Sequence, residues 1–120
     1  MKLIFDENCL FCKIVKGTEP SEKILEHGDF LVIKNKYPNV PIHVLVLDKK
    51  HREKSDTISG VYKNENYWDS FFEVLYMAIL KLGLDKTGYK LGNNGAGYNH
   101  FEHEHFHVMG GTKKEPIDPM

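Results

Sequence analysis

The chain has 120 residues, of which 41% are hydrophobic and 28% are charged, and its 16 Lys and Arg nearly balance its 17 Asp and Glu. This size and composition predict one domain, residues 1–120, that can bury a core without disulfides. The net charge of −1 excludes nucleic acid as the main ligand of a broadly basic surface. No apolar run approaches the roughly 18 residues of a membrane span, and the N-terminus does not resemble a signal peptide, so we expect a cytoplasmic protein that does not bind membranes.

Taken in chain order, the residue pattern predicts an α+β unit of short strands and two helices. Residues 9–16 are expected to form a short helix or knuckle that ends at Gly17. Strands are expected over residues 23–26, 30–34, 43–47, 88–91 and 103–109. The polar segment 48–60 is expected to be a loop.

The long helical pattern covers about residues 65–82, where apolar side chains recur every three or four positions. These residues are Trp68, Phe71, Phe72, Leu75, Ala78, Ile79 and Leu82. Gly83 is the expected end of the helix. One face of it is therefore expected to pack against a domain core of about residues 9–111, with residues 112–120 as a C-terminal tail.

Three histidines at alternate positions, His103, His105 and His107, are the most informative feature of the chain. In a strand, side chains at alternate positions point to one face and are separated by roughly 7 Å. Three imidazoles on one face are costly to bury without partners. The row is therefore a catalytic row, a metal site or a solvated strand face.

Two further motifs have the composition of ligand sites. Cys9 and Cys12 are two thiols at the spacing of a metal half-site, although free thiols or a redox pair are alternatives. The segment 92–97 is rich in Gly and Asn, and backbone N–H groups in such a turn can face phosphate oxygens. This loop gains significance because it lies six to ten residues before the histidine row.

The histidine row, followed by Val108 and Met109, resembles the signature of the histidine triad (HIT) superfamily of nucleotide hydrolases and transferases. The trailing Gly110 and Gly111 are similar to the histidine triad nucleotide-binding (Hint) branch, and segments 9–14, 38–46 and 49–51 are similar to other parts of the family. The resemblance implies a HIT-like fold, with a five-stranded, mainly antiparallel sheet, one long helix and one short helix. It also implies a homodimer with a continuous sheet, built through the two long helices.

The resemblance implies attack on the α-phosphate of a nucleoside phosphoramidate or a dinucleoside polyphosphate, with a purine nucleotide as substrate. His105 would form a covalent nucleotidyl intermediate, and water would release the nucleoside monophosphate. His107 would donate to the phosphoryl oxygens, and His103 would orient the site. A neutral imidazole is a competent nucleophile near pH 7, and the implied reaction needs no metal in the chemical step.

The resemblance also implies the substrate contacts. Asn93, Gly97, Asn99 and His100 are the candidates for the phosphate, and Asn35, Ile33 and His43 for the nucleoside. Asn99 and His100 depart from the usual Gln and Ser or Thr, and His100 is equally explained as a solvated loop residue. Asn35 is alternatively a turn residue, and His43 a structural one. Asn35 favours the dinucleotide-hydrolysing branch, whereas Gly110 and Gly111 favour the phosphoramidase branch.

A structural zinc ion is implied at Cys9, Cys12, His51 and His103, because some bacterial relatives of this kind have a His 39 residues after the second Cys. Glu104 departs from the family pattern, in which an apolar residue is usual between the first two histidines of the row. It is expected to be solvated, to meet a Lys, or to raise the pKa of a neighbouring histidine. Two rival classes are a non-catalytic nucleotide-binding protein and a metal-binding module that uses His100 together with the histidine row.

Overall fold

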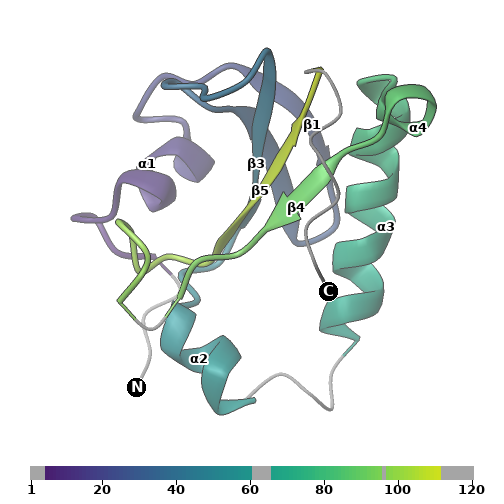
Figure 1. Cartoon of the computed structure of the whole chain (residues 1–120). Coiled ribbons are helices and arrows are strands. Elements are labelled where there is room, and N and C mark those ends of the chain that lie inside the picture. Colours follow the sequence, from purple (N-terminus) through teal and green to yellow (C-terminus); the bar gives the residue numbers. More distant parts are fainter. Residues whose placement is uncertain (1–4, 61–65, 96, 112–120) are drawn as a thin grey trace.

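Five strands form one antiparallel sheet in the computed structural model, which describes residues 5–60, 66–95 and 97–111 (Figure 1). The spatial order of the strands is β1-β2-β3-β5-β4, and every neighbouring pair is antiparallel. Their bounds are β1 Lys23–His27, β2 Phe30–Lys34, β3 Ile42–Asp48, β4 Lys90–Gly92 and β5 His105–Gly110. The five strands expected from the sequence are therefore confirmed, with shifts of one or two residues at their ends.

The helices differ more from expectation. The described residues contain four of them: α1 Leu10–Lys16, α2 Lys54–Ser59, α3 Tyr67–Lys81 and α4 Leu84–Thr87. The expected loop over residues 48–60 is wrong, because α2 lies within it, and the expectation of one long and one short helix is wrong in number. Helix α2 is only six residues long, and it begins with local hydrogen bonds such as Glu53 N–H to Asp56 Oδ2 (2.9 Å). Its sequence therefore has no apolar periodicity from which a helix could be predicted.

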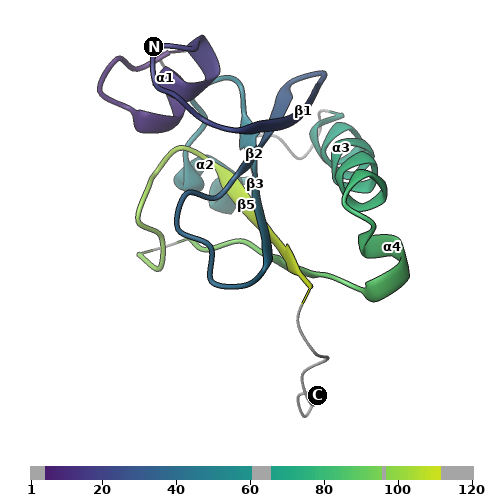
Figure 2. The same cartoon turned by 90° about the horizontal axis from the view of Figure 1, so that it is seen from above.

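Side chains alternate between two apolar clusters on opposite faces of the sheet. On β2, Phe30 and Val32 pack on the α3 side, whereas Leu31 and Ile33 pack with Phe11 of α1. Figure 2 shows α1 and α3 on opposite sides of the strands. The same alternation on β5 sends Phe106 and Val108 to the α3 side, and leaves the other face for histidines.

The first histidine of the row does not belong to β5. His103 forms an isolated antiparallel bridge with Glu53, and the regular strand begins only at His105. The expected strand over residues 103–109 is therefore wrong at its start. Among the described residues, no helix combines the length and hydrophobicity needed to cross a bilayer. The expected tail, residues 112–120, and the first residue of the expected long helix lie outside the described residues.

Candidate functional site

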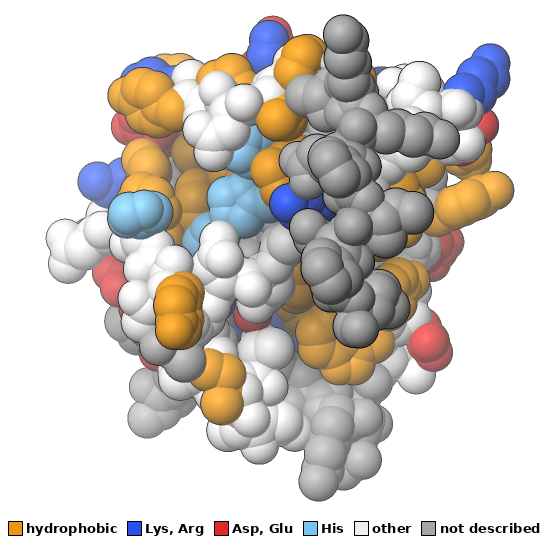
Figure 3. Space-filling view, viewed as in Figure 1, with side chains coloured by type: hydrophobic (Ala, Val, Ile, Leu, Met, Phe, Trp, Pro, Cys, Tyr) orange, Lys and Arg blue, Asp and Glu red, His pale blue; other side chains and the backbone are white. Residues whose placement is uncertain are grey.

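The three histidines of the row divide between two adjoining sites. The ring of His103 faces the cysteines, with its Nδ1 atom 3.4 Å from the Sγ atoms of both Cys9 and Cys12. His105 and His107 pack against each other with ring centroids 5.3 Å apart. The space-filling view shows histidine side chains gathered in a hollow of the surface that hydrophobic side chains border (Figure 3).

His105 has a fixed tautomer. Its Nδ1 lies 2.8 Å from the backbone oxygen of His103, so Nδ1–H donates to that carbonyl and Nε2 keeps its lone pair. The ring is enclosed by Phe11 and Phe101, at centroid distances of 5.0 and 6.4 Å. Burial lowers the pKa of His105 to about 4, and the charges of Lys54 and His107 act in the same direction. At neutral pH the ring is therefore uncharged, and its Nε2 lone pair is available.

His107 is oriented by a fourth histidine. His43 lies on β3, and its Nε2 is 2.9 Å from Nδ1 of His107. The N–H of Asn39 donates to Nδ1 of His43 (3.2 Å), so neutral His43 carries its proton on Nε2 and donates to His107. This assignment leaves the proton of His107 on Nε2, as a donor. Burial lowers the pKa of both rings, which keeps them neutral near pH 7.

Two of the three nucleoside candidates, Ile33 and Asn35, line an open cleft of about 930 Å³ between α1 and the end of β2, whereas His43 does not line it. Its lining includes Ile33 and Asn35, together with Leu10, Phe11, Ile14 and Leu45. Asn35 accepts a hydrogen bond from the N–H of Tyr37 (2.9 Å) through Oδ1, and its Nδ2 lies 3.2 Å from Nε2 of His43. Phe11, which lines the cleft, also contacts His105, so the cleft and the histidines lie on either side of the same ring.

The four phosphate candidates do not share one environment. The amide of Asn93 donates to Glu104 Oε1 (2.8 Å) and to the backbone oxygen of His105 (3.2 Å). The amide of Asn99 donates to the Phe101 oxygen and to Glu102, at 3.1 and 2.8 Å. Gly97 and His100 are exposed. The two asparagines thus hold the loop and the start of β5, and phosphate binding by these four residues stays a prediction.

Four ligand atoms converge at the start of α1. The donor atoms of Cys9, Cys12, His51 and His103 all lie within 4.8 Å of one another, and both cysteines are free. His51 Nδ1 is 3.3 Å from the Cys12 Sγ atom. His103 Nε2–H donates to the Asp48 carbonyl (2.6 Å), which leaves the Nδ1 lone pair directed at the sulfurs. Two thiols and two imidazoles fit a tetrahedral zinc ion.

The same geometry contradicts the metal-binding alternative built on the histidine row. Within residues 5–60, 66–95 and 97–111, the one group able to hold a metal joins His103 to Cys9, Cys12 and His51. His105 uses Nδ1 on a carbonyl, and His100 is exposed outside this group. The row is therefore not a single metal site, because its first member turns toward α1 while the other two do not.

Sequence reasoning missed Lys54. Its side chain is 1% exposed and lies beneath β5, where Nζ is 2.5 Å from Oε1 of the fully buried Glu104. Of the three interpretations of Glu104, contact with a Lys is confirmed and solvation is wrong. The third, a raised pKa in a neighbouring histidine, is outweighed by burial, which lowers the pKa of both His103 and His105. The sequence did not indicate a buried Lys54, because this residue lies in a polar segment whose composition is typical of an exposed loop.

Comparisons with known proteins agree with this geometry. The family model that matches is the HIT domain, over residues 16–114. An "Uncharacterized HIT-like protein" of Chlamydia trachomatis is 32% identical over 110 residues, which cover 85% of this chain and 91% of that protein. The "Adenosine 5'-monophosphoramidase HNT1" of Candida albicans is also 32% identical over 110 residues, with coverage of 85% and 69%.

A solved structure supports the fold. The HIT family hydrolase from Legionella pneumophila superposes with a TM-score of 0.78 at 28% identity, and the match covers 88% of this chain and 95% of that one. The matched family model spans most of the chain and includes the whole histidine row. The resemblance to the histidine triad superfamily is confirmed, and the chain belongs to the HIT domain family.

Proposed function

We propose that this protein is a nucleotide hydrolase or transferase that attacks the α-phosphate of a nucleoside phosphoramidate or a dinucleoside polyphosphate. The observation that carries the proposal is the state of His105, a buried neutral ring whose Nδ1–H is held by the His103 carbonyl at 2.8 Å. A lone pair on Nε2 is the requirement for nucleophilic attack on phosphorus. The phosphoramidase name of the Candida albicans relative supports the same reaction class.

The reaction has two displacements. In the first, Nε2 of His105 forms a bond to phosphorus, the bond from phosphorus to the leaving group breaks, and an amine leaving group takes up one proton from solvent. Nε2–H of His107 donates to a phosphoryl oxygen, where charge accumulates in the transition state. In the second, water attacks phosphorus, displaces His105 and returns one proton to solvent, which releases the nucleoside monophosphate and restores the neutral ring. The net reaction is hydrolysis, and every group used by the protein is an imidazole already at the site.

The cleft beside α1 suits the nucleoside. A purine ring would lie against the apolar wall made by Phe11, Ile14 and Ile33, and this wall leads directly to His105. Asn35 lines the same cleft, and an amide can donate to one ribose hydroxyl and accept from the other. The proposed substrate is therefore a purine ribonucleotide with the α-phosphate directed toward β5.

The four-residue metal group has a structural role in the proposal. Cys9, Cys12, His51 and His103 would hold zinc with all four tetrahedral positions filled, so the ion would not bind substrate. When bound, zinc would join α1 to the segment that directly precedes β5, the strand that carries the proposed nucleophile. Helix α1 also carries Phe11, which contacts His105, so the ion would stabilise one wall of the active site.

The proposal includes a homodimer. Helix α3 has a second apolar stripe on its outer side, at intervals of four residues. The residues of this stripe, Trp68, Phe72, Tyr76 and Leu80, are 38–61% exposed. Large aromatic side chains grouped on one helix face are typical of an interface, and a second copy of the chain would bury them against the same stripe.

Parallel assays of adenosine 5′-phosphoramidate and diadenosine tetraphosphate test the proposal, with His105→Ala as the inactive variant. His27→Ala is a matched control, because His27 lies on β1 and pairs with Glu73 at the surface. We expect AMP release from at least one substrate by the wild-type protein and His27→Ala, and none by His105→Ala. Turnover by His105→Ala at the wild-type rate would contradict the proposed nucleophile, and AMP binding without turnover by the wild type would contradict an enzyme.

A further inference from the structure

His105 pairs with Leu47 of β3 on one side, but on the side of β4 its peptide groups are held by side chains. The ladder between β4 and β5 ends at the pair Gly92 and His107, so β4 does not reach His105. At His105 the backbone oxygen accepts from Lys54 Nζ (2.8 Å) and from the Asn93 amide (3.2 Å). The N–H of His105 donates to Glu104 Oε1 (2.9 Å). Three side chains thus provide the hydrogen bonds that another residue of β4 would otherwise supply.

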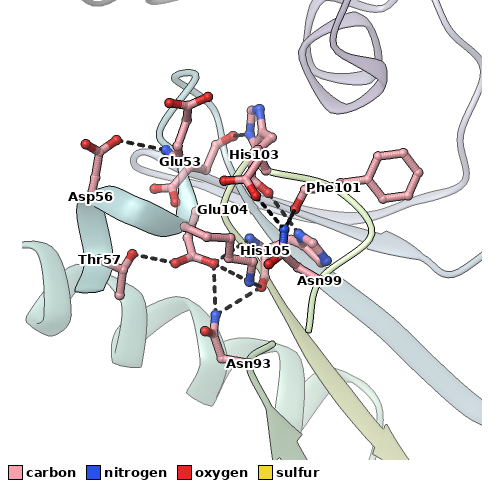
Figure 4. A network of polar contacts seen from close by, with 12 residues as sticks. Glu53, Asp56, Thr57, Asn93, Asn99, Phe101, His103, Glu104 and His105 are labelled. Carbon is pink, nitrogen blue, oxygen red and sulfur yellow. Dashed lines mark hydrogen bonds and ion pairs between the residues drawn. The ribbon is translucent and has the colours of Figure 1, made fainter. Parts of the chain in front are cut away.

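Glu104 is the centre of this group. Its Oε1 receives Lys54 Nζ at 2.5 Å, the Asn93 amide at 2.8 Å and the His105 N–H, and its Oε2 accepts from the hydroxyl of Thr57. Both charged side chains are almost completely buried, at 1% and 0% exposure. Figure 4 shows Thr57 and Asn93 directed at Glu104 from two different parts of the chain. The carboxylate is therefore fully satisfied by four donors.

A buried ion pair of this kind is weak evidence for stability. Removing two charges from water costs about as much as their attraction returns, and well-packed apolar side chains commonly replace such a pair without loss. What an apolar pair cannot do is hydrogen-bond to a peptide group. The distinctive effect of Lys54 and Glu104 is thus the fixed direction of the His105 backbone.

That direction determines where the nucleophile lies. The ring of His105 is tied to the His103 carbonyl, which belongs to the peptide unit directly before Glu104. Any rotation of the backbone at residues 104–105 therefore moves both the ring and its hydrogen-bond acceptor. A misplacement of about 1 Å can lower the rate of a chemical step by about 100-fold.

We infer that Lys54 and Glu104 are positioning residues for His105, and that the buried ion pair holds the backbone of the nucleophile in its reactive orientation. Both side chains are buried and hydrogen-bond to the His105 backbone, so both act through His105. The kinetic consequence depends on the proposed function, whereas the orientation of the ring does not. A loss of the pair is expected to lower kcat and to leave KM and AMP affinity nearly unchanged.

Two double variants with the same net charge separate hydrogen bonding from charge. Lys54→Met with Glu104→Leu removes the ion pair and every acceptor for the His105 N–H. Lys54→Met with Glu104→Gln removes the charges and retains one acceptor. The partly exposed pair Lys49 and Glu26, at 2.6 Å, provides the matched control, Lys49→Met with Glu26→Leu.

The readouts are kcat, KM, the AMP dissociation constant, the melting temperature and the ¹⁵N NMR spectrum of the His105 ring at pH 7.5. We expect the Leu double variant to fold, to bind AMP within about threefold of wild type, and to lose about 10- to 100-fold in kcat. Its ring should show a mixture of tautomers, whereas the wild type shows the Nδ1–H form alone. The Gln double variant should recover part of both properties, and the control should match the wild type.

Wild-type kcat and a single tautomer in a folded Leu double variant would overturn the inference. If that variant does not fold, the Gln double variant decides, because it also lacks the Lys54 donor to the His105 carbonyl, and wild-type kcat with a single tautomer there would overturn the inference equally. If the wild type turns over no nucleotide, the proposed function fails. The tautomer of His105 in the variants then decides the positioning role by itself.

Discussion

The Nδ1 atom of His105 lies 2.8 Å from the backbone oxygen of His103, so the first histidine of the row orients the second through its carbonyl and not through its ring. The ring of His103 is itself occupied, with Nε2 on the Asp48 carbonyl and Nδ1 on the two cysteines. One residue therefore serves two sites at once. Its side chain belongs to the candidate metal site of Cys9, Cys12, His51 and His103, and its main chain selects the tautomer of His105.

The pH dependence of turnover should reflect the buried state of His105. Burial lowers its pKa to about 4, and only the neutral ring attacks phosphorus. A histidine with the ordinary pKa of about 6.5 would lose activity as the pH falls below 6.5. We expect kcat/KM instead to stay level from pH 8 to pH 6, and to fall only as the pH approaches about 4. Initial rates at constant ionic strength, corrected for acid hydrolysis of the substrate, give the profile, and an acid limb centred near 6.5 would contradict it.

Removal of zinc should destabilise the protein. A ligand that binds only the folded state at about 100 times its Kd adds about 2.7 kcal/mol to the free energy of unfolding, so chelation should lower Tm by several degrees. Elemental analysis of the purified protein should find zinc near one equivalent per chain. The Cys9→Ser and Cys12→Ser double variant is the control, because a chelator should not change its Tm. A zinc-free protein whose Tm does not respond to added zinc would exclude the site.

Asn35 should distinguish ribose from deoxyribose. It lines the cleft with an amide that can bond to both ribose hydroxyls, whereas a 2′-deoxy substrate offers only one. We expect the wild type to prefer the ribonucleotide by roughly fivefold, since one hydrogen bond contributes about 1 kcal/mol, and Asn35→Ala to lose most of that preference. The ratio of kcat/KM for the two sugars measures it. If wild type and Asn35→Ala show the same ratio of kcat/KM for the two sugars, Asn35 does not bind the ribose.

The outer stripe of α3 should be a dimer interface. Phe72 is 56% exposed, and a carboxylate at its position would be brought against the same position or its neighbours in a second copy. We expect the wild type to have the mass of a dimer in light scattering, and Phe72→Glu the mass of a monomer. Lys50→Glu, which changes an exposed residue between β3 and α2, is the control for added negative charge and should remain a dimer. A monomeric wild type would contradict the interface.

Local residue patterns were sufficient for the strands, the long helix and the chemistry of the motifs. A period of two residues determines which face of a strand a side chain occupies, and a period of 3.6 residues determines which stripe of a helix it occupies. The strands over residues 30–34 and 43–47 were therefore predictable from their own residues, without knowledge of the strands beside them. The spacing of Cys9 and Cys12 indicated a metal half-site for the same local reason. Helix α2 escaped detection because hydrogen bonds at its ends and contacts beneath β5 stabilise it, and neither leaves an apolar repeat.

The sequence by itself determined the sheet, its two faces and the presence of three imidazoles at one end of the chain. Only the tertiary structure decided how those imidazoles are used, because a strand period specifies a face and not the partners across it. The ring of His103 faces the cysteines, and His107 contacts His43 because β3 pairs with β5. Glu104 forms an ion pair with Lys54 of α2, which is 50 residues away in sequence. Each of these contacts joins residues that are far apart in the chain, and their energies depend on burial that folding alone creates.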